Sequence, residues 1–316
     1  MMNSNLMNEN NYIDISDNKR PADDRPVDIP VITVESLPYS FDESHNEKRK
    51  NMIWPICIVF ILLLFVAGLF IYLNGEPSLK SSVSDEQNID LLSSTHPEVE
   101  GLKGVNIVTD SILGVAFNIY PLEGLRGHLE KEIPDTADQS VVLFMRSADY
   151  HPDGSTIGTM VMNGKHTPAK ERRSRAAYMA FSKEGIPALG ISLSDDLSDF
   201  AQKNEGDFFR QFPLLIDGEL PSSFVLHGKV ERGAIGRMAD GSLNYFLTRN
   251  RESMYDFADA LREYGVVDAI YITGGNGYEF YRDREGNAHV SDNLRRHYDK
   301  YHDRKSIAPL LVWRTK

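Results

Sequence analysis

Two short stretches carry residue types that proton transfer and ligand binding require. In the first, MRSADYHPDGSTIG (residues 145–158), Asp149 and His151 stand two positions apart, directly after an apolar run. A carboxylate and an imidazole this close can pass protons to and from a bound substrate. The alternative is a plain turn, because Pro-Asp-Gly is typical turn sequence and a histidine beside it is often only a loop residue. Spacing alone leaves both interpretations open.

A glycine turn is the second stretch. DAIYITGGNGYEFY (268–281) passes from an apolar segment through Thr273, Gly274, Gly275 and Asn276 to an aromatic segment. Glycines let successive backbone N–H groups approach an anion closely. The turn lacks the Lys-Ser/Thr of a P-loop and the spacing of a dinucleotide fingerprint. A simple Asn-Gly hairpin turn is therefore the competing interpretation.

Basic residues supply charge that a phosphate or an acidic glycan needs. The run KHTPAKERRSR covers 165–175 and offers several guanidinium groups, which bind phosphate oxygens through charge-assisted hydrogen bonds. A solvated loop is the alternative for this run. His297 and His302 are five positions apart, which is wrong for a shared metal on one helix face. No motif predicts a metal site or a cofactor.

Apolar patterning predicts the elements that position these residues. SVVLFMR (140–146) is typical of a strand buried on both faces. Ser253 and Gly265 mark the start and stop of a helix between predicted strands at 243–248 and 266–272. Such a strand–helix–strand unit would place Thr273 beyond the carboxyl end of a buried strand, where ligands bind in open α/β sheets.

These patterns predict an α/β (mixed α+β) fold, with a central mixed sheet flanked by helices. Less regular segments give weaker predictions. Residues 124–134 read as a short helix stopped by a proline, and 205–212 as helix or loop. Residues 294–305 read as a terminal surface helix.

A charge-free apolar run precedes this domain. MIWPICIVFILLLFVAGLFIYLNG (52–75) is long enough to cross a hydrocarbon core of roughly 30 Å. Lys48, Arg49 and Lys50 precede it, which by the positive-inside rule places the N-terminus in the cytoplasm. A secretory signal peptide fits poorly, because fifty residues come before the run and no small-x-small cleavage site follows it.

The chain is therefore predicted to have four parts. They are a disordered cytoplasmic tail at 1–50, a transmembrane helix at 51–74 with membrane contact over 52–73, a polar stalk at 75–100, and an outer domain at 101–316. The formal charge of −12 argues against nucleic-acid binding. The only cysteine, Cys57, lies in the apolar run, so the outer domain has no disulfide.

The outer domain also lacks an Asn-x-Ser/Thr acceptor, which favours a bacterial envelope over a eukaryotic secretory pathway. We expect a single-pass protein of the bacterial inner membrane with its C-terminal domain in the periplasm.

Four sequence blocks, in their order and spacing, resemble the phosphodiester glycosidase family. FMRSADYHPDGSTIGTMVMNGK is similar to the family's Asn-Ala/Gly-Gly-x-Phe/Tyr segment and the Asn-Gly strand after it. PLLIDGEL is similar to its apolar run ending in a glycine turn, and RGAIGRMADG to its Arg-x-x-x-Gly hairpin. YDFADALREYGVVDAIYITGG resembles its helix and the strand leading to Leu-Asp-Gly-Gly/Ser. Together the blocks cover roughly 101–290.

The resemblance implies a sugar-phosphate pocket with the glycine turn as its floor. The substrate-binding residues that it implies are Arg146, Arg232, Thr273, Gly274, Gly275 and Asn276. Asp149 or His151 would handle protons, and the expected ligand is a glycan or a sugar phosphate.

Two departures from the family motif bear on activity. Arg146 stands where the family has Asn, and Thr273 stands where it has Asp. Threonine does not ionise near neutral pH, so it cannot replace an acidic group in acid–base chemistry. Two function classes remain. One is a membrane-anchored hydrolase of a sugar phosphodiester or envelope polysaccharide, and the other is a catalytically inactive relative that binds a glycan or an envelope protein partner.

Overall fold

The chain divides into two compact units, Met1–Glu76 and Pro77–Lys316. A computed structural model describes residues 62–63, 81–95, 102–151, 153–167, 175–224, 226–272, 279–301 and 305–315. The predicted tail and nearly all of the predicted membrane helix therefore lie outside the described residues. Within those described, no helix is both long and apolar enough to cross a membrane. The transmembrane helix stays a prediction.

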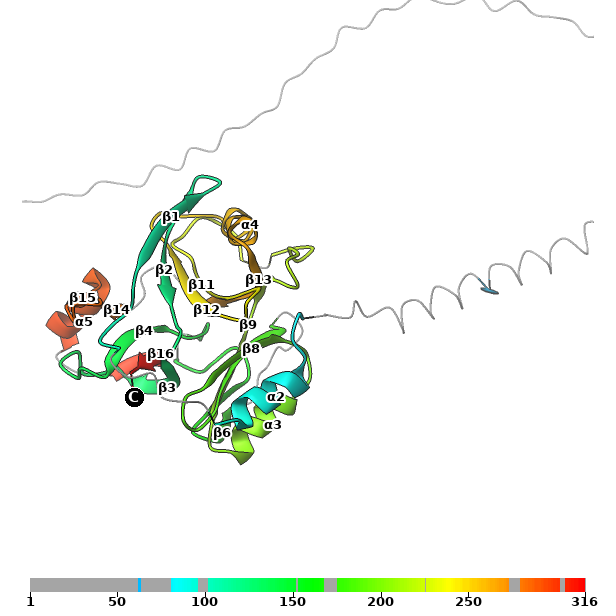
Figure 1. The fold of residues 1–316 in the computed structure, drawn as a ribbon, viewed down its shortest axis with the longest axis horizontal. Helices are drawn as coiled ribbons and strands as arrows, with labels where there is room; N and C mark the ends of the chain where they lie inside the picture. The colour runs from blue at the N-terminus through cyan, green and yellow to red at the C-terminus, as the bar shows by residue number, and fades with distance from the viewer. Residues whose placement is uncertain are drawn as a thin grey trace, which may run out of the picture. The chain divides into compact units, whose positions relative to one another are not determined.

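Three antiparallel sheets make up the described part of the second unit (Figure 1). The first sheet has the strand order β1 (Val108–Ile112), β2 (Val115–Pro121), β12 (Leu243–Thr248), β11 (Gly233–Met238), β13 (Val266–Ile272) and β10 (Pro213–Leu215). The second has the order β15 (Ala288–Val290), β14 (Phe280–Arg282), β4 (Val141–Arg146), β16 (Lys305–Arg314) and β3 (Arg126–Glu132). The third has the order β6 (Lys165–Thr167), β5 (Met160–Met162), β9 (Asp207–Gln211), β7 (Ala177–Phe181) and β8 (Pro187–Ile191).

One apolar core joins the three sheets. It contains Ile270 of the first sheet, Trp313 of the second and Phe209 of the third, all fully buried. Helices cover the outer faces: α4 (Met254–Tyr264) packs on the first sheet, α5 (Asp292–Tyr301) on the second, and α2 (Asp85–Ser93) with α3 (Asp196–Lys203) on the third (Figure 1). Each sheet is thus buried on both faces over much of its area, as the continuous apolar run of β4 predicted.

The prediction of a mixed α and β fold is confirmed, but the predicted mixed central sheet is wrong. The strands named above pair antiparallel, and the one parallel contact among the described residues is an isolated bridge, Val105 to Asp283. β11 lies between β12 and β13 and pairs antiparallel with both. The strands on either side of α4 therefore run parallel without being neighbours.

Three local predictions also need correction. Residues 126–132 form β3 and not a helix, because Gly127 and Leu129 alternate inward with a period of two. Residues 207–211 form β9, which is buried throughout. The helix predicted at 294–305 is found as α5 but is not terminal, since β16 follows it and lies inside the second sheet.

The predicted start and stop of α4 are confirmed. The Ser253 side chain accepts a hydrogen bond from the Asp256 backbone N–H at 3.0 Å, and Gly265 ends the helix with a φ of 98°. We expect Ser253→Ala to lower the free energy of unfolding by about 1 kcal/mol, because one helix N–H loses its acceptor. Urea titration followed by circular dichroism measures this. Ser253→Asp, which keeps an acceptor, should change stability by only a few tenths of that, and an equal loss in both variants would contradict the capping account.

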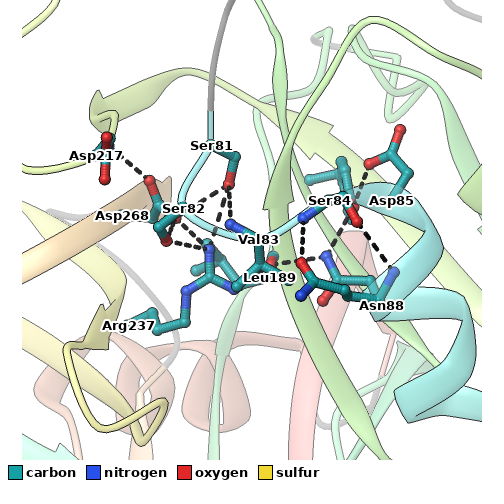
Figure 2. A network of polar contacts seen from close by, with 12 residues as sticks. Ser81, Ser82, Val83, Ser84, Asp85, Asn88, Leu189, Asp217, Arg237 and Asp268 are labelled. Atoms are coloured by element: carbon teal, nitrogen blue, oxygen red, sulfur yellow. Dashed lines mark hydrogen bonds and ion pairs between the residues drawn. The ribbon is translucent and has the colours of Figure 1, made fainter.

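A buried ion pair anchors the chain segment that enters the domain (Figure 2). Arg237 of β11 and Asp268 of β13 are paired neighbours in the first sheet and form a salt bridge with both side chains almost fully buried. Ser81 and Ser82 cover this pair: their hydroxyls donate to Asp268 Oδ2 at 3.0 and 2.5 Å. Arg237 also donates to the Leu189 carbonyl of β8 at 3.0 Å, which ties the first sheet to the third.

α2 continues this contact on the third sheet. The Tyr178 hydroxyl of β7 donates to Asp85 at 2.6 Å and accepts from the buried Asn88 amide at 2.8 Å. The Asn88 amide also donates to the Leu189 carbonyl at 3.0 Å (Figure 2). Leu92 adds an apolar contact to the same face. Residues 81–95 lie within the segment predicted as a stalk, and they fold onto the domain.

Candidate functional site

The carboxyl end of β13 is where the sequence placed the site, and the structure lines it with aromatic groups. Ile272, the last residue of β13, pairs with Gly233 of β11. A Cβ at Gly233 would lie 3.1 Å from the Tyr245 hydroxyl oxygen and 3.2 Å from the Ile272 carbonyl oxygen, so glycine keeps room for the tyrosine. On the other side of β13, the Tyr271 N–H donates to the Phe212 carbonyl at 2.9 Å.

Glu279 is the acidic group at this end of the domain. It directly precedes β14, and its Oε1 atom is buried without a hydrogen-bond partner among the described residues. The pKa of Glu279 is raised to about 7, mainly by burial and to a smaller extent by the nearby negative charge of Glu231, while a hydrogen bond with Tyr120 opposes the rise. Glu231 itself is exposed. The buried carboxyl is therefore poised to gain or lose a proton near neutral pH.

Tyrosines surround this carboxyl. The rings of Tyr120 and Tyr245, cross-strand partners on β2 and β12, lie 5.4 Å apart, and Tyr281 of β14 lies 5.5 Å from Tyr120. Burial raises the pKa of both Tyr120 and Tyr245 well above the ordinary value, and the Glu279 charge adds to this. Both phenols therefore stay protonated at physiological pH and can act as hydrogen-bond donors.

A second polar pair lies behind Tyr281. The His289 ring stacks on the Tyr281 ring at 4.4 Å, and its Nε2 lies 2.9 Å from Asp283 Oδ2. This hydrogen bond lowers the pKa of Asp283 below its ordinary value. The pair holds the outer side of the aromatic group in place.

Strand alternation decides which predicted residues share this region. Tyr281 pairs with Leu143 and packs into the central core, so Glu279, two residues earlier, projects to the same face of the second sheet. Phe144 packs on the opposite face in the cluster that contains Leu294 of α5. Arg146, two residues after Phe144, leaves β4 on that opposite face, where its guanidinium lies 5.3 Å from the Tyr150 ring centre.

Asp149 and His151 occupy a loop with different roles. Asp149 forms an ion pair with Arg175, with Oδ2 and Nη2 3.4 Å apart. His151 lies in the turn: its N–H donates to the Ser155 carbonyl and its carbonyl accepts from Gly154 N–H, both at 2.8 Å. The turn interpretation is confirmed for the backbone, and a proton-transfer role for either side chain stays a prediction.

Arg232 is buried and holds backbone. It is 2% exposed, its Nε donates to the Glu252 carbonyl at 3.1 Å, and its Nη2 donates to the Gly228 carbonyl at 2.7 Å. The guanidinium lies 6.0 Å from the Tyr271 ring centre, near the end of β13. These contacts fix the approach to β11, and phosphate binding by Arg232 stays a prediction.

The remaining predicted residues lie outside the described part of the chain. These are Thr273, Gly274, Gly275 and Asn276, together with residues 168–174 of the basic run. Across the residues that are described, no three His, Cys, Asp or Glu side chains gather where they could hold a metal ion.

Sequence reasoning missed Glu279, although one signal was present. In GYEFY the glutamate alternates with Phe280 and so faces the same side as Tyr281, which places an acidic group on an aromatic, inward face. A charged residue at such a position is rarely buried without a reason.

The fold and these groups define an α+β domain in which a buried carboxyl with a raised pKa, Glu279, directly precedes β14. The profile of the phosphodiester glycosidase family matches residues 141–306, more than half of the chain. The chain belongs to the phosphodiester glycosidase family.

Comparisons with solved structures add two weaker similarities. The catalytic domain of zebrafish N-acetylglucosamine-1-phosphodiester alpha-N-acetylglucosaminidase, auto-inhibited by its pro-peptide, is 16% identical, with a TM-score of 0.47, over 76% of this chain and 96% of that one. A hypothetical protein from Synechocystis is 11% identical, with a TM-score of 0.36, over 66% of this chain and 62% of that one. A comparison with curated proteins gives no match.

Proposed function

We propose that the domain hydrolyses the glycosidic bond of a sugar-1-phosphodiester, with Glu279 as the general base. One observation carries this proposal: just before β14 lies a buried carboxyl whose Oε1 has no hydrogen-bond partner among the described residues and whose pKa is raised to about 7. Strongly perturbed carboxyls of this kind cluster at functional sites. Membership of the glycosidase family supplies the reaction class and makes a sugar or sugar phosphate the natural ligand.

The chemistry of the substrate favours a base over an acid. A phosphate monoester is a stable anion and leaves the anomeric carbon with little help, whereas water is a poor nucleophile. In the proposed step the water oxygen bonds to the anomeric carbon, the bond from that carbon to the phosphate oxygen breaks, and Glu279 accepts the water proton. A carboxylate with a pKa near 7 is a stronger base than an ordinary glutamate, and a large fraction of it is ionised at neutral pH.

Glu279 also compensates for the departure at Thr273. The family motif has an aspartate there, and threonine cannot take over its charge. Glu279 stands six positions later in the sequence and restores an ionisable group. Thr273 favours the alternative, a catalytically inactive relative that binds a glycan or an envelope partner. An assay of hydrolysis distinguishes the two.

We further propose that the domain is anchored at a bacterial inner membrane, with the N-terminus in the cytoplasm and the domain outside. The charge-free run at 52–75 and the basic residues just before it support this placement. The substrate would then be a glycan phosphodiester or polysaccharide of the cell envelope.

The test is hydrolysis of an alkyl phosphodiester of a sugar 1-phosphate by the full chain in detergent, in water enriched in ¹⁸O. We expect turnover with the label in the released sugar, because the proposal breaks the carbon–oxygen bond. Label in the phosphate would contradict it. Turnover by Thr273→Asp but none by the wild type would identify the chain as the inactive relative.

A further inference from the structure

Arg175 is a buried cation whose hydrogen-bonding capacity is largely unused. It is 5% exposed, and its Nε has no hydrogen-bond partner among the described residues. Its one ion pair there, with Asp149, spans 3.4 Å, and its guanidinium lies 4.2 Å from the Phe212 ring centre. A guanidinium has five N–H donors, and burying its charge is costly unless acceptors surround it. One long ion pair and a phenyl face leave most of that capacity unmet.

Gln211 adds a second unmet donor at the same place. It is fully buried, its Oε1 accepts the Phe212 N–H at 3.1 Å, and its Nε2 has no partner in the described part of the chain. Gln211 pairs with Ala177 across β9 and β7. Arg175 precedes Ala177 by two residues and its guanidinium lies on the ring of Phe212, the residue after Gln211, so Arg175 and Gln211 lie at the same end of the third sheet.

This pair of donors lies beside the end of β13. The Phe212 ring lies next to the Arg175 guanidinium, and the Phe212 carbonyl accepts a hydrogen bond from the Tyr271 N–H at 2.9 Å. Gly158 lies against Arg175 and the β9 backbone: a Cβ there would lie 3.2 Å from Arg175 Cδ and 2.6 Å from the Arg210 carbonyl oxygen. The backbone thus approaches the arginine as closely as glycine allows.

We propose that Arg175 and Gln211 form an oxyanion-binding subsite for the phosphate of the substrate, with Asp149 as a positioning residue that orients Arg175. The groups without partners, Arg175 Nε and Gln211 Nε2, are both hydrogen-bond donors. The matching ligand therefore presents acceptors and no donors, which fits a phosphodiester better than a sugar hydroxyl. The choice of phosphate as the natural oxyanion rests on the proposed function. Binding itself does not require turnover, so the two can fail separately.

The test uses the full chain in detergent and inorganic phosphate as the probe, with binding read from ³¹P line broadening and from the shift in Tm at constant ionic strength. We expect saturable binding by the wild type and by Glu279→Gln. Gln211→Glu keeps the acceptor for the Phe212 N–H and replaces the free donor with a carboxylate oxygen. It should weaken phosphate binding at least tenfold.

Arg175→Lys should also weaken binding, because a single ammonium loses the planar donor set. Arg262→Gln, on the exposed face of α4, is the matched control and should bind as the wild type does. Non-saturable binding by the wild type would overturn the subsite, as would unchanged affinity in a folded Gln211→Glu. Saturable phosphate binding without any turnover would keep the subsite and refute only the proposed reaction.

Discussion

Asp268→Asn is expected to destabilise the domain by about 3–5 kcal/mol, one of the largest losses open to a single substitution here. The change leaves the buried Arg237 guanidinium without its counter-charge, since the side chains of the pair are 8% and 0% exposed. It also weakens the acceptor for Ser81, Ser82 and the Asp217 N–H, which lies 2.9 Å from Asp268 Oδ1. Urea unfolding followed by tyrosine and tryptophan fluorescence measures the loss.

A surface pair of the same chemistry is the matched control for Asp268. Asp259 and Arg262 on α4 form an ion pair with 22% and 43% exposed side chains, and Asp259→Asn should cost less than about 1 kcal/mol. Similar losses at the two positions would refute the buried anchor. Ser82→Ala should lower the free energy of unfolding by an amount between these two losses. This loss measures how much the contact of residues 81–95 with the ion pair contributes to stability.

The pH dependence of this anchor has a definite sign. Burial alone would raise the pKa of Asp268, but hydrogen bonds from Asp217 N–H, Ser82 and Arg237, with the charge of Arg237, lower it below the ordinary value. A carboxyl whose folded pKa is lowered stabilises the fold above its unfolded pKa, and that stability is lost as pH falls through the folded pKa. The difference in the free energy of unfolding between the wild type and Asp268→Asn should therefore become smaller only at acidic pH.

Glu279→Gln is expected to raise the stability of the domain at high pH, whereas Asp268→Asn lowers it. The folded pKa of Glu279 is about 7, above the ordinary 4.5, so its protonated form is favoured by folding. The stabilising contribution is fully present below pH 4.5 and is lost as pH rises through 7. At pH 8 the wild type bears a buried, ionised carboxylate, and the variant should be more stable by up to about 3 kcal/mol. At pH 4.5 the two should be nearly equal.

Unfolding titrations of both proteins at pH 4.5, 6, 7 and 8 give this comparison directly. Glu231→Gln is the control, because Glu231 is exposed and perturbs Glu279 only through its charge. It should shift stability little at any of these pH values. A stability difference for Glu279→Gln that does not grow with pH would contradict a buried titrating carboxyl.

The elements that sequence predicted well are those with strong local signals. Ser253 and Gly265 mark α4 through capping chemistry, and Val141–Arg146 reads as a buried strand because its apolar run has no polar break. β3 was missed because its residues Arg126, His128 and Glu130 face outward and suggest a solvated helix, while the inward Gly127 supplies no apolar side chain. Its strand identity comes from pairing with β16, almost two hundred residues later in the chain.

The candidate site also has a part that the sequence predicts and a part that only the fold creates. The carboxyl end of β13 was predictable as a location, because a helix stop and an apolar run lead into it. Glu279 was not, because its raised pKa comes from burial and from the charge of Glu231, against an opposing hydrogen bond from Tyr120, and only the fold brings these groups near it. Arg232 shows the converse: its motif suggested ligand binding, and its described contacts are to backbone carbonyls.

The measurement that tests the central claim most directly is the pH profile of kcat/KM for the sugar-1-phosphodiester, in the wild type and in Glu279→Gln. The account predicts a rate that rises with pH to a plateau, with an apparent pKa near 7 set by Glu279. In Glu279→Gln the plateau should fall by about 10²–10⁴-fold and the rising limb should disappear. A wild-type rate that falls through this range, or a rising limb that survives in Glu279→Gln, would contradict it.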